Sequence, residues 1–513
     1  MQKLSSVHAL SFDALSPIFE FAVKAGQTPD EITKIPLALS QVCGAWRQSA
    51  LRYAPLWTNI LLDVRGDRSL ERATEFLSRS RTLPVCVTFD MQGARGELTG
   101  LKERVGFLAP YEHRLRALRV QGATTAVPIH CFLQDLDFTF TNLKDFEIAW
   151  GKPTTRLARC SPLLSRDEMT KGLRPFYLHL SSHDKFTNLT RFALNAYDNR
   201  LDIQLDELLE ILGVSPTLQH LELEGLHFDY EDDEFYDADD PDSEKSILQL
   251  PHLRFLSLKQ CMSGAFLPRI NIPATANVVL VANDPFMLDY GDIHASSPTI
   301  LYALPPHFEE LSFIGKTEAL DFEIRDSGIT LRASQSSGQY LFIEQLPYPD
   351  ALYNDTIEEM VLLSATSFHH SDLGPVTRIR ASNQLSESKR GILRDAEPYE
   401  VDDWLSTMSN LEKLEICYFP LKFLKGFSGC KAPRQPPLAA KDVTLTLYPN
   451  ECGDFEELKA WVKARAEAQL PFEKLEITLD CSAPATLPVD EKFVDSLRSS
   501  LAEYVKGVVV QCQ

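Results

Sequence analysis

The sequence predicts an α/β protein in which a small helical module is followed by strands that alternate with helices. Three observations lead to this prediction. Apolar residues near the N-terminus recur every three or four positions, which is the period of a helix. A short apolar phrase typical of a strand then recurs nine times, and several of its occurrences are preceded by segments with helical periodicity.

Length and composition narrow the class of protein. The chain has 513 residues, enough for two or more domains, and it is 44% hydrophobic and 24% charged, as expected of a soluble globular protein. Its net charge of −21 with no basic cluster argues against a nucleic-acid-binding surface. No apolar run is long enough to span a membrane.

The ten cysteines are scattered, and no two have CxxC spacing, which is typical of buried thiols in a reducing compartment. The N-terminal residues MQKLSSVHAL lack the apolar core of a signal peptide. We therefore expect a cytoplasmic or nuclear protein that needs no metal and no cofactor.

Two amphipathic helices are predicted within the first 60 residues. The first has an apolar stripe that ends before Gly26 and consists of Leu15, Ile18, Phe19 and Ala22. The second has a stripe on one helix face that consists of Leu39, Val42, Cys43 and Trp46, and Pro55 marks a break before Trp57. So short a segment cannot bury this much apolar surface by itself, so part of it must face the rest of the chain or a partner.

The pattern Leu-Ser-x-Val-Cys-x-x-Trp-Arg-x-x-Ala within PLALSQVCGAWRQSA, followed by Pro-Leu-Trp, resembles the F-box motif. The upstream run LSFDALSPIF resembles the opening half of that motif. In that family the motif is a helical module that docks on the Skp adaptor of cullin-RING ubiquitin ligases. The chain departs from the pattern at Ser11, where the family usually has Pro, and at residues 26–35, which are expected to lengthen the link between the halves. The alternative is an ordinary helical hairpin packed in a core.

The resemblance implies an adaptor-binding surface, some of whose candidate residues must belong to the internal core instead. The candidates are Leu10, Leu15, Ile18, Phe19, Leu37, Leu39, Val42, Cys43, Trp46 and Trp57.

Four elements are predicted after this module, in order along the chain. They are a strand over 58–64, a helix over 67–80, a strand over 83–89 and a helix over 98–109. The recurring phrase, apolar-x-x-apolar-x-apolar, begins after them. Its occurrences start at Leu115, Leu143, Leu189, Leu218, Leu253, Phe308, Ile357, Leu411 and Phe472.

These phrases resemble leucine-rich repeats, whose parallel strands line the inner face of a curved solenoid. The resemblance implies an irregular repeat-type α/β solenoid after the F-box-like module. Only the unit with Cys261 carries the Asn or Cys that the family places after the strand. The predicted organisation is therefore a module over 1–64, a connecting segment over 65–110 and a repeat-like domain over 111–513.

Two regions interrupt the predicted repeats. An insertion over 227–246 contains ten carboxylates between Asp229 and Glu244, which predicts a solvated loop because it lacks the Gly and Glu of a calcium-binding EF-hand. Residues 264–350 predict antiparallel strands over 277–281 and 327–333. The pattern then returns to a strand over 443–447, a helix over 455–468, a strand over 475–479 and a helix over 490–505. A helix over 205–212, ended by Gly213, is the clearest between repeats.

The common catalytic motifs are incomplete. Gly315-Lys316-Thr317 lacks the glycine of a phosphate-binding loop because Glu310 stands in its place. His369, His370 and Asp372 have no second metal-binding motif to support them. We therefore predict no catalytic residues, although a site assembled from distant residues remains an alternative.

The outward positions of the predicted strands are rich in charge. Because strand side chains alternate, these positions face the inner surface of a repeat array, where acidic residues outnumber basic ones. We expect this face to bind a protein segment that carries Lys or Arg. The candidate residues are Glu147, Arg191, Glu222, Lys413, Glu415 and Glu476.

The resemblances together imply a non-catalytic substrate receptor of an SCF-type ubiquitin ligase. Its partners would be a Skp-type adaptor, a cullin reached through the adaptor and an unknown protein substrate, with neither nucleic acid nor membrane. One alternative is a protein-binding scaffold whose F-box acts outside a ligase or is vestigial. An enzyme with an unrecognised site is the other.

Overall fold

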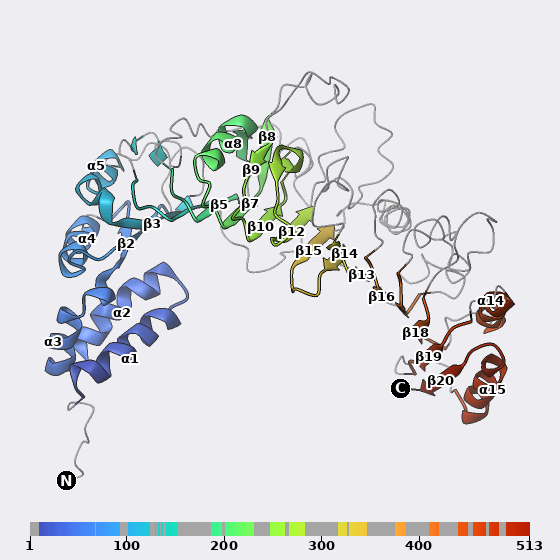
Figure 1. Ribbon diagram of the computed structural model, residues 1–513. Coiled ribbons are helices and arrows are strands. Elements are labelled where there is room, and N and C mark those ends of the chain that lie inside the picture. The colour runs from blue at the N-terminus through green and yellow to red at the C-terminus, as the bar shows by residue number, and fades with distance from the viewer. Residues whose placement is uncertain are drawn as a thin grey trace, which may run out of the picture. The chain divides into compact units, whose positions relative to one another are not determined.

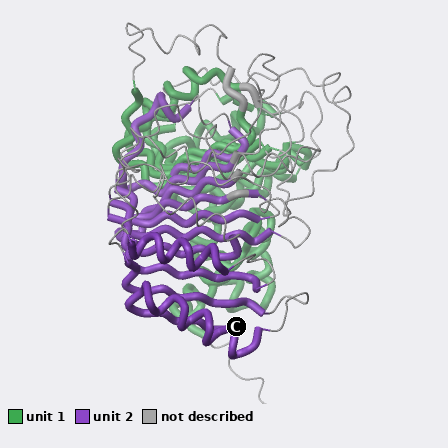
Figure 2. Tube along the Cα trace, turned by 90° about the vertical axis from the view of Figure 1, so that its right-hand side faces the viewer, with its two compact units in different colours: residues 1–255 green, residues 256–513 purple. Residues whose placement is uncertain are grey.

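The structure is a computed structural model, and it forms two compact units, residues 1–255 and 256–513 (Figure 2). The residues that it describes are 10–66, 68–92, 101–123, 129, 132–133, 135–136, 140–150, 186–196, 201–229, 247–261, 266–282, 316–325, 328–345, 375–385, 410–419, 440–449, 455–467, 471–481 and 489–512.

The chain opens with three helices that pack against one another (Figure 1). They are α1 (Phe12–Ala25), α2 (Pro29–Gln41) and α3 (Gly44–Arg52), and the short helix η2 (Ala54–Trp57) follows. Ser11 caps α1 by accepting a hydrogen bond from the Ala14 amide, so the serine that departs from the F-box pattern starts this helix. Thr28 and Glu31 form a capping box at the start of α2.

Two predictions about this module are wrong. The stripe from Leu39 to Trp46 does not lie on one helix, because Cys43 has an extended backbone (φ −163°, ψ 174°) that separates α2 from α3. The link over 26–35 is not a long connection either. Only residues 26–28 join α1 to α2, and the capping box turns the remainder of the segment into the first turns of α2.

The first unit continues as strands with helices between them. These elements are β1 (Asn59–Asp63), α4 (Arg68–Arg79), β2 (Val85–Asp90), α5 (Leu101–Gly106), η3 (Ala109–Arg114), β3 (Leu115–Ala123), β4 (Asp145–Trp150), β5 (Arg191–Ala196), β6 (Leu201–Gln204), α8 (Leu205–Gly213), β7 (His220–Glu224), β8 (Leu226–Asp229) and β9 (Leu248–Gln249). The helix predicted over 98–109 ends earlier than expected, at Gly106, and a 3-10 helix follows it.

In the described part of the second unit, two α-helices lie near its C-terminal end, and most of the other elements are strands. Its elements are β10 (Phe255–Lys259), whose first residue belongs to the first unit, η6 (Leu267–Arg269), β11 (Ile270–Asn271), β12 (Asn277–Ala282), β13 (Ala319–Arg325), β14 (Gly328–Ser334), β15 (Tyr340–Gln345), β16 (Arg378–Gln384), β17 (Lys413–Cys417), β18 (Asp442–Leu447), α14 (Phe455–Glu467), β19 (Lys474–Leu479), α15 (Glu491–Ala502) and β20 (Gly507–Cys512).

Sixteen of these strands form one mostly parallel sheet in the order β1-β2-β3-β4-β5-β7-β10-β12-β15-β14-β13-β16-β17-β18-β19-β20. The α/β class and the N-terminal helices predicted from the sequence are confirmed. The predicted antiparallel region is confirmed in part: β14 pairs antiparallel with both β13 and β15, whereas β12, the other strand predicted there, pairs parallel with β15.

The recurring phrase is confirmed as a strand wherever the structure describes it. The strands that contain it are β3, β4, β5, β7, β10, β17 and β19. The phrases that start at Phe308 and Ile357 lie outside the described residues, as does the acidic run from residue 230 to 246. The predicted insertion begins inside β8, which ends at Asp229.

Register explains where the core of the second unit lies. Leu414 of β17 is level with Val443 of β18 and Leu475 of β19, and all three are buried. Helix α15 packs on β20 and buries Val494, Leu497 and Leu501 (Figure 1). The neighbouring residues in each strand point to the opposite face, where polar and charged side chains lie. One face of these strands is therefore core, and the other carries their polar and charged side chains.

Several strands end in a residue with a left-handed backbone. Gly225 follows β7 with φ +69°, Gln260 follows β10 with φ +53°, and Tyr418 follows β17 with φ +63°. Within the second unit, the Gln260 amide donates to the Val281 carbonyl at 2.7 Å, and the Tyr418 amide donates to the Thr446 carbonyl at 2.6 Å. The same turn therefore recurs at the carboxyl ends of strands that carry the repeated phrase.

Candidate functional site

The N-terminal helices expose an unusual share of large apolar side chains. Six of the nine such side chains among the described residues lie between positions 10 and 51. They are Leu10 (38% exposed), Phe12 (42%), Ile18 (41%), Phe21 (75%), Val42 (52%) and Leu51 (41%), and we call them the helical apolar surface. Neighbouring exposed apolar side chains, such as Ile18 and Phe21 at i,i+3 on α1, are typical of protein-binding surfaces.

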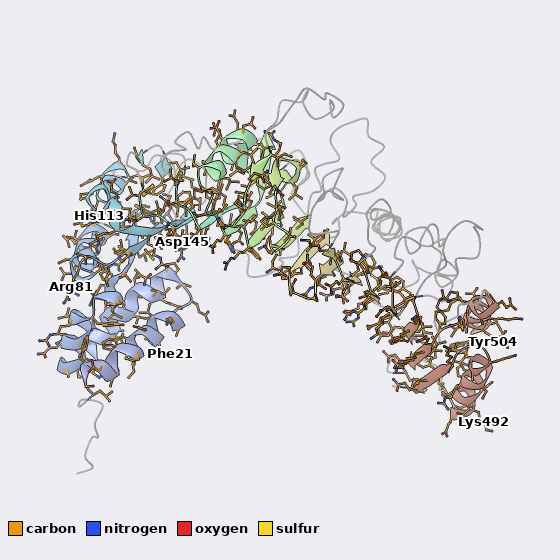
Figure 3. The ribbon with its side chains drawn as sticks, viewed as in Figure 1. Phe21, Arg81, His113, Asp145, Lys492 and Tyr504 are labelled. Carbon is orange, nitrogen blue, oxygen red and sulfur yellow. The ribbon has the colours of Figure 1, made fainter. Side chains whose placement is uncertain are left out.

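Phe21 is the most exposed of these side chains, and it projects from α1 in Figure 3. Neither Phe21 nor Phe12 nor Leu51 was among the residues predicted from sequence. The signal for Phe21 is nevertheless present, since Ala14, Ile18, Phe21 and Ala25 recur at spacings of four, three and four, which defines a second stripe on α1. The stripe through Leu15 and Phe19 is the one that faces inward.

The interior of the module is aromatic. Phe19 is fully buried and contacts the ring of Trp46 edge-on, with the centroids 5.6 Å apart. Trp57 is also fully buried, and its indole N–H donates to the Ala50 carbonyl at 2.8 Å. The Trp57 ring contacts Phe76 of α4 edge-on at 5.0 Å. Phe19 therefore holds α1 to α3, and Trp57 joins the helices to the first strand-helix unit.

The structure divides the ten predicted docking residues into three groups. Leu15, Phe19 and Trp57 are buried within the chain, so they support the surface without forming it. Leu10, Ile18 and Val42 are exposed. Leu37, Leu39, Cys43 and Trp46 are partly exposed.

A hydrogen bond between α1 and the end of α3 fixes the orientation of the exposed stripe. The Tyr53 hydroxyl donates to Oε1 of Glu20, and the Tyr53 ring contacts Phe12 edge-on at 6.0 Å. Burial, followed by this hydrogen bond, raises the pKa of Tyr53 to about 12. The phenol therefore keeps its proton and remains a donor at neutral pH.

The polar face of the first unit carries a ladder of alternating charges. Arg191 Nη1 lies 2.6 Å from Glu147 Oε2, and Arg191 Nη2 lies 3.5 Å from Glu222 Oε2. Arg119 Nε approaches the same Glu147 oxygen at 3.3 Å, and His220 Nε2 lies 3.6 Å from Glu222. The ladder crosses β3, β4, β5 and β7, which are adjacent in the sheet. Three of the six predicted face residues are thus brought together.

Burial and charge act in opposite directions on Arg191. Burial by itself would lower the pKa of the guanidinium, but the hydrogen bond to Glu147 and the nearby carboxylates raise it above its usual value. The arginine therefore stays charged and holds two carboxylates in place.

The other three predicted face residues lie on the polar face of the second unit. Lys413 Nζ is 2.7 Å from Glu415 Oε1, and Lys474 Nζ is 2.8 Å from Glu476 Oε1. Arg380 Nε lies 3.8 Å from the second Glu415 oxygen. The glutamates that recur in the phrase are therefore paired with basic residues of the same face. A cationic partner would have to compete with these internal ion pairs.

The described residues contain no group of three or more His, Cys, Asp or Glu side chains that could hold a metal ion. The predicted weak candidates His369, His370 and Asp372 lie outside the described residues, and so does Gly315. In the part of the chain that the structure describes, no helix is long and apolar enough to cross a lipid bilayer.

Comparison with known proteins adds no assignment: no protein-family model matches the chain, and no curated protein matches it either.

Proposed function

We propose that this protein is the substrate-recognition subunit of an SCF-type cullin-RING ubiquitin ligase. The helices α1 to α3 would act as an F-box that binds a Skp-type adaptor, and the strands that follow would bind the target protein. The single observation that carries the proposal is the helical apolar surface, because it lies on the same three helices that contain the F-box-like residues.

The helical apolar surface supplies the energy that docking needs. Burying a Leu, Ile or Phe side chain contributes about 1.5–3 kcal/mol before the costs of association are subtracted. Five of the six side chains are Leu, Ile or Phe and the sixth is Val42; because they are 38–75% exposed, each offers part of this energy, and several of them must be covered together to hold an adaptor. The buried residues Phe19 and Trp57 keep the helices rigid, so the surface is already formed before the partner arrives.

The repeated strands support the second half of the proposal. We infer an irregular leucine-rich-repeat-like solenoid from the seven strands that carry the phrase, from their parallel neighbours and from the recurring left-handed turn. Its polar face would receive a segment of the target that carries Lys or Arg. Such a receptor performs no chemistry itself. It holds a target near a ubiquitin-conjugating enzyme in a cytoplasmic or nuclear ligase, and it needs no cofactor.

The adaptor assignment is tested by a double substitution, Ile18→Asp with Leu39→Asp. Both side chains belong to the predicted surface, and a charge on each would prevent its burial. We expect the variant to lose co-purification with a Skp-type adaptor. The matched control is Ile247→Asp with Phe493→Asp, which charges two exposed apolar side chains outside the module. Normal adaptor recovery with the first variant would refute the proposal.

The target-binding half is tested by reversing the charge of Glu222, Glu415 and Glu476 together. We expect weaker capture of a partner rich in Lys or Arg, and unchanged capture would refute this half. Because each glutamate has a basic neighbour, Glu→Gln at the same positions serves as the control for lost internal ion pairs.

Recovery of a cullin separates a ligase subunit from a scaffold. A tagged full-length chain that brings down the adaptor together with a cullin supports the ligase. Recovery of the adaptor without a cullin would favour the scaffold, whose F-box acts outside a ligase.

A further inference from the structure

Three side chains gather at the carboxyl ends of neighbouring parallel strands in the second unit. Tyr418 follows β17, Tyr448 follows β18, and Asp480 follows β19, each as the first residue past its strand. The Tyr418 hydroxyl donates to Asp480 Oδ2 at 3.0 Å. The two tyrosine rings stack with their centroids 4.5 Å apart and their planes inclined by 26°. We call these residues the tyrosine-aspartate cluster, and all three are partly exposed.

The backbone of Tyr418 is held in an unfavourable conformation. Its φ of +63° is uncommon for a residue with a bulky side chain, and it repeats the left-handed turn at Gln260 after β10, where the side chain is smaller. Two bonds to its backbone maintain this geometry. The Tyr418 amide donates to the Thr446 carbonyl, and the buried amide side chain of Asn383 donates to the Tyr418 carbonyl at 3.0 Å. The chain therefore places this ring at the end of the strand against its own backbone preference.

Charge differs between the two ends of these strands. Three of the four strands β16 to β19 begin with a basic residue, namely Arg378, Lys413 and Lys474. At the carboxyl ends, Asp480 provides a carboxylate beside the aromatic rings. Burial, and then the hydrogen bond to Asp480, raises the pKa of Tyr418, so this phenol keeps its proton and remains a donor to the carboxyl group of Asp480.

We propose that the tyrosine-aspartate cluster binds a guanidinium group, as carried by an arginine side chain of a partner polypeptide. A guanidinium is planar, stacks on aromatic faces and donates hydrogen bonds to a carboxylate, which can accept from more than one donor at once. Carboxyl ends of parallel strands are also where open α/β sheets bind their ligands. The inference rests on one part of the proposed function, the binding of a polypeptide by the second unit. It does not depend on adaptor binding by the N-terminal helices.

The test uses the full-length chain and N-acetyl-L-argininamide as the probe, followed by tyrosine absorbance and by NMR. N-acetyl-L-citrullinamide has nearly the same shape without the charge, and N-acetyl-L-lysinamide has the charge without the planar group. We expect saturable binding of the arginine probe, with affinity about tenfold above that of either other probe. Equal binding of the citrulline probe would overturn the charge argument, and equal binding of the lysine probe would overturn the assignment to guanidinium.

Variants separate binding from folding. Asp480→Asn and Tyr448→Leu should each lower the affinity for the arginine probe at least about fivefold, whereas Tyr448→Phe, which keeps the ring, should bind normally. Tyr418→Phe should bind at least as tightly as the wild type, because it keeps the ring and removes a competing donor from Asp480. Asp495→Asn, on the exposed side of α15, is the control carboxylate.

Circular dichroism and thermal unfolding identify any variant that has lost its fold. If Asp480→Asn does not fold, Asp480→Glu replaces it. Its displaced carboxylate should lower the affinity for the arginine probe several-fold. Wild-type affinity in folded Asp480→Asn or Tyr448→Leu would overturn the site. Adaptor co-purification is measured on the same variants. Loss of probe binding with normal adaptor recovery separates failure of this site from failure of the proposed docking function.

Discussion

Nη1 of Arg191 lies 2.6 Å from Oε2 of Glu147 on the neighbouring strand, and this pair is the centre of the charged ladder on the first unit. The second guanidinium nitrogen reaches towards Glu222 on the strand at the other side. One arginine therefore joins three strands, and most of each side chain in the pair is shielded from water. Such a pair matters more for stability than an exposed one, because removing Arg191 takes away the nearest positive charge from two poorly solvated carboxylates, of which Glu147 keeps only the longer contact with Arg119.

Arg191→Met should therefore lower the free energy of unfolding by about 1–3 kcal/mol, since it leaves Glu147 and Glu222 without their shared partner. Urea denaturation followed by circular dichroism measures the change. Lys34→Met is the matched control, because the Lys34–Asp30 pair lies at i,i+4 on an exposed helix face and should contribute at most about 0.5 kcal/mol. An Arg191 effect as small as that of Lys34 would show that the ladder is only a surface feature.

Substitutions of Phe19 and Phe21 should affect different properties, the first the stability of the fold and the second the binding of the adaptor. Phe21→Ala should change the unfolding free energy by less than about 0.5 kcal/mol, because this side chain is already 75% exposed. The affinity of the Phe21→Ala variant for a Skp-type adaptor should nevertheless be at least about tenfold below that of the wild type if Phe21 is covered in the complex. Phe19→Ala should instead lower stability by about 3–5 kcal/mol, since its ring is fully buried. Thermal unfolding and adaptor titration measure the two effects, and equal adaptor affinity of Phe21→Ala and wild type would exclude Phe21 from the docking surface.

Gly225 is required by a turn as well as by space. Its φ is +69°, and a Cβ at this position would lie 2.1 Å from the carbonyl oxygen of Ala196. Gly338 also has a positive φ, +92°, but a Cβ there would meet nothing within 4 Å. Gly338→Ala should therefore cost only the backbone strain, about 1–2 kcal/mol, and Gly225→Ala clearly more. Chemical denaturation of both variants gives the comparison, and equal costs would mean that β5 and the turn after β7 separate without penalty.

The Tyr53–Glu20 bond makes stability depend on pH in the alkaline range. Burial and the carboxylate raise the pKa of Tyr53 to about 12 from an unfolded value of 10.0. A group whose pKa is raised by folding contributes stability that is complete below pH 10 and is lost as the pH rises towards 12. The difference in unfolding free energy between wild type and Tyr53→Phe should therefore be constant from pH 7 to 9 and shrink between pH 10 and 12. A difference that is the same at pH 8 and pH 11.5 would contradict this assignment.

Local periodicity predicted most of the individual elements. The helix α4, the strand β2 and the helix α15 each lie within one to three residues of their predicted bounds, because an apolar stripe specifies which face of an element is buried. Periodicity failed between Leu39 and Trp46. There the helical spacing continues in register across Cys43, although the backbone at that residue is extended and two helices meet. Because the apolar spacing is the same on both sides of Cys43, the pattern of apolar residues does not reveal that the helix is interrupted there.

The pattern of residues was also insufficient to define the docking surface. The motif indicated which residues belong to the module, but it placed Leu15, Phe19 and Trp57 beside Ile18 as equal candidates. Only their burial separates them. The most exposed aromatic side chain, Phe21, was missed because its stripe, which shares only Ile18 with the more apolar stripe of the motif, lies beside that stripe on α1.

The sequence by itself determined the α/β class, the helical start and the strands that carry the repeated phrase, because these depend on period and on the chemistry of neighbouring residues. The tertiary structure decided which charges meet between strands. Glutamates that recur in the sequence predicted an acidic face, yet register places Arg191 of β5 beside Glu147 of β4 and near Glu222 of β7. Lys413 and Lys474 each lie two residues before their glutamate on the same strand, so the alternation of strand side chains already places those pairs on one face. Ion pairs between strands depend on distances between residues that are far apart in the chain, and sequence spacing does not contain those distances.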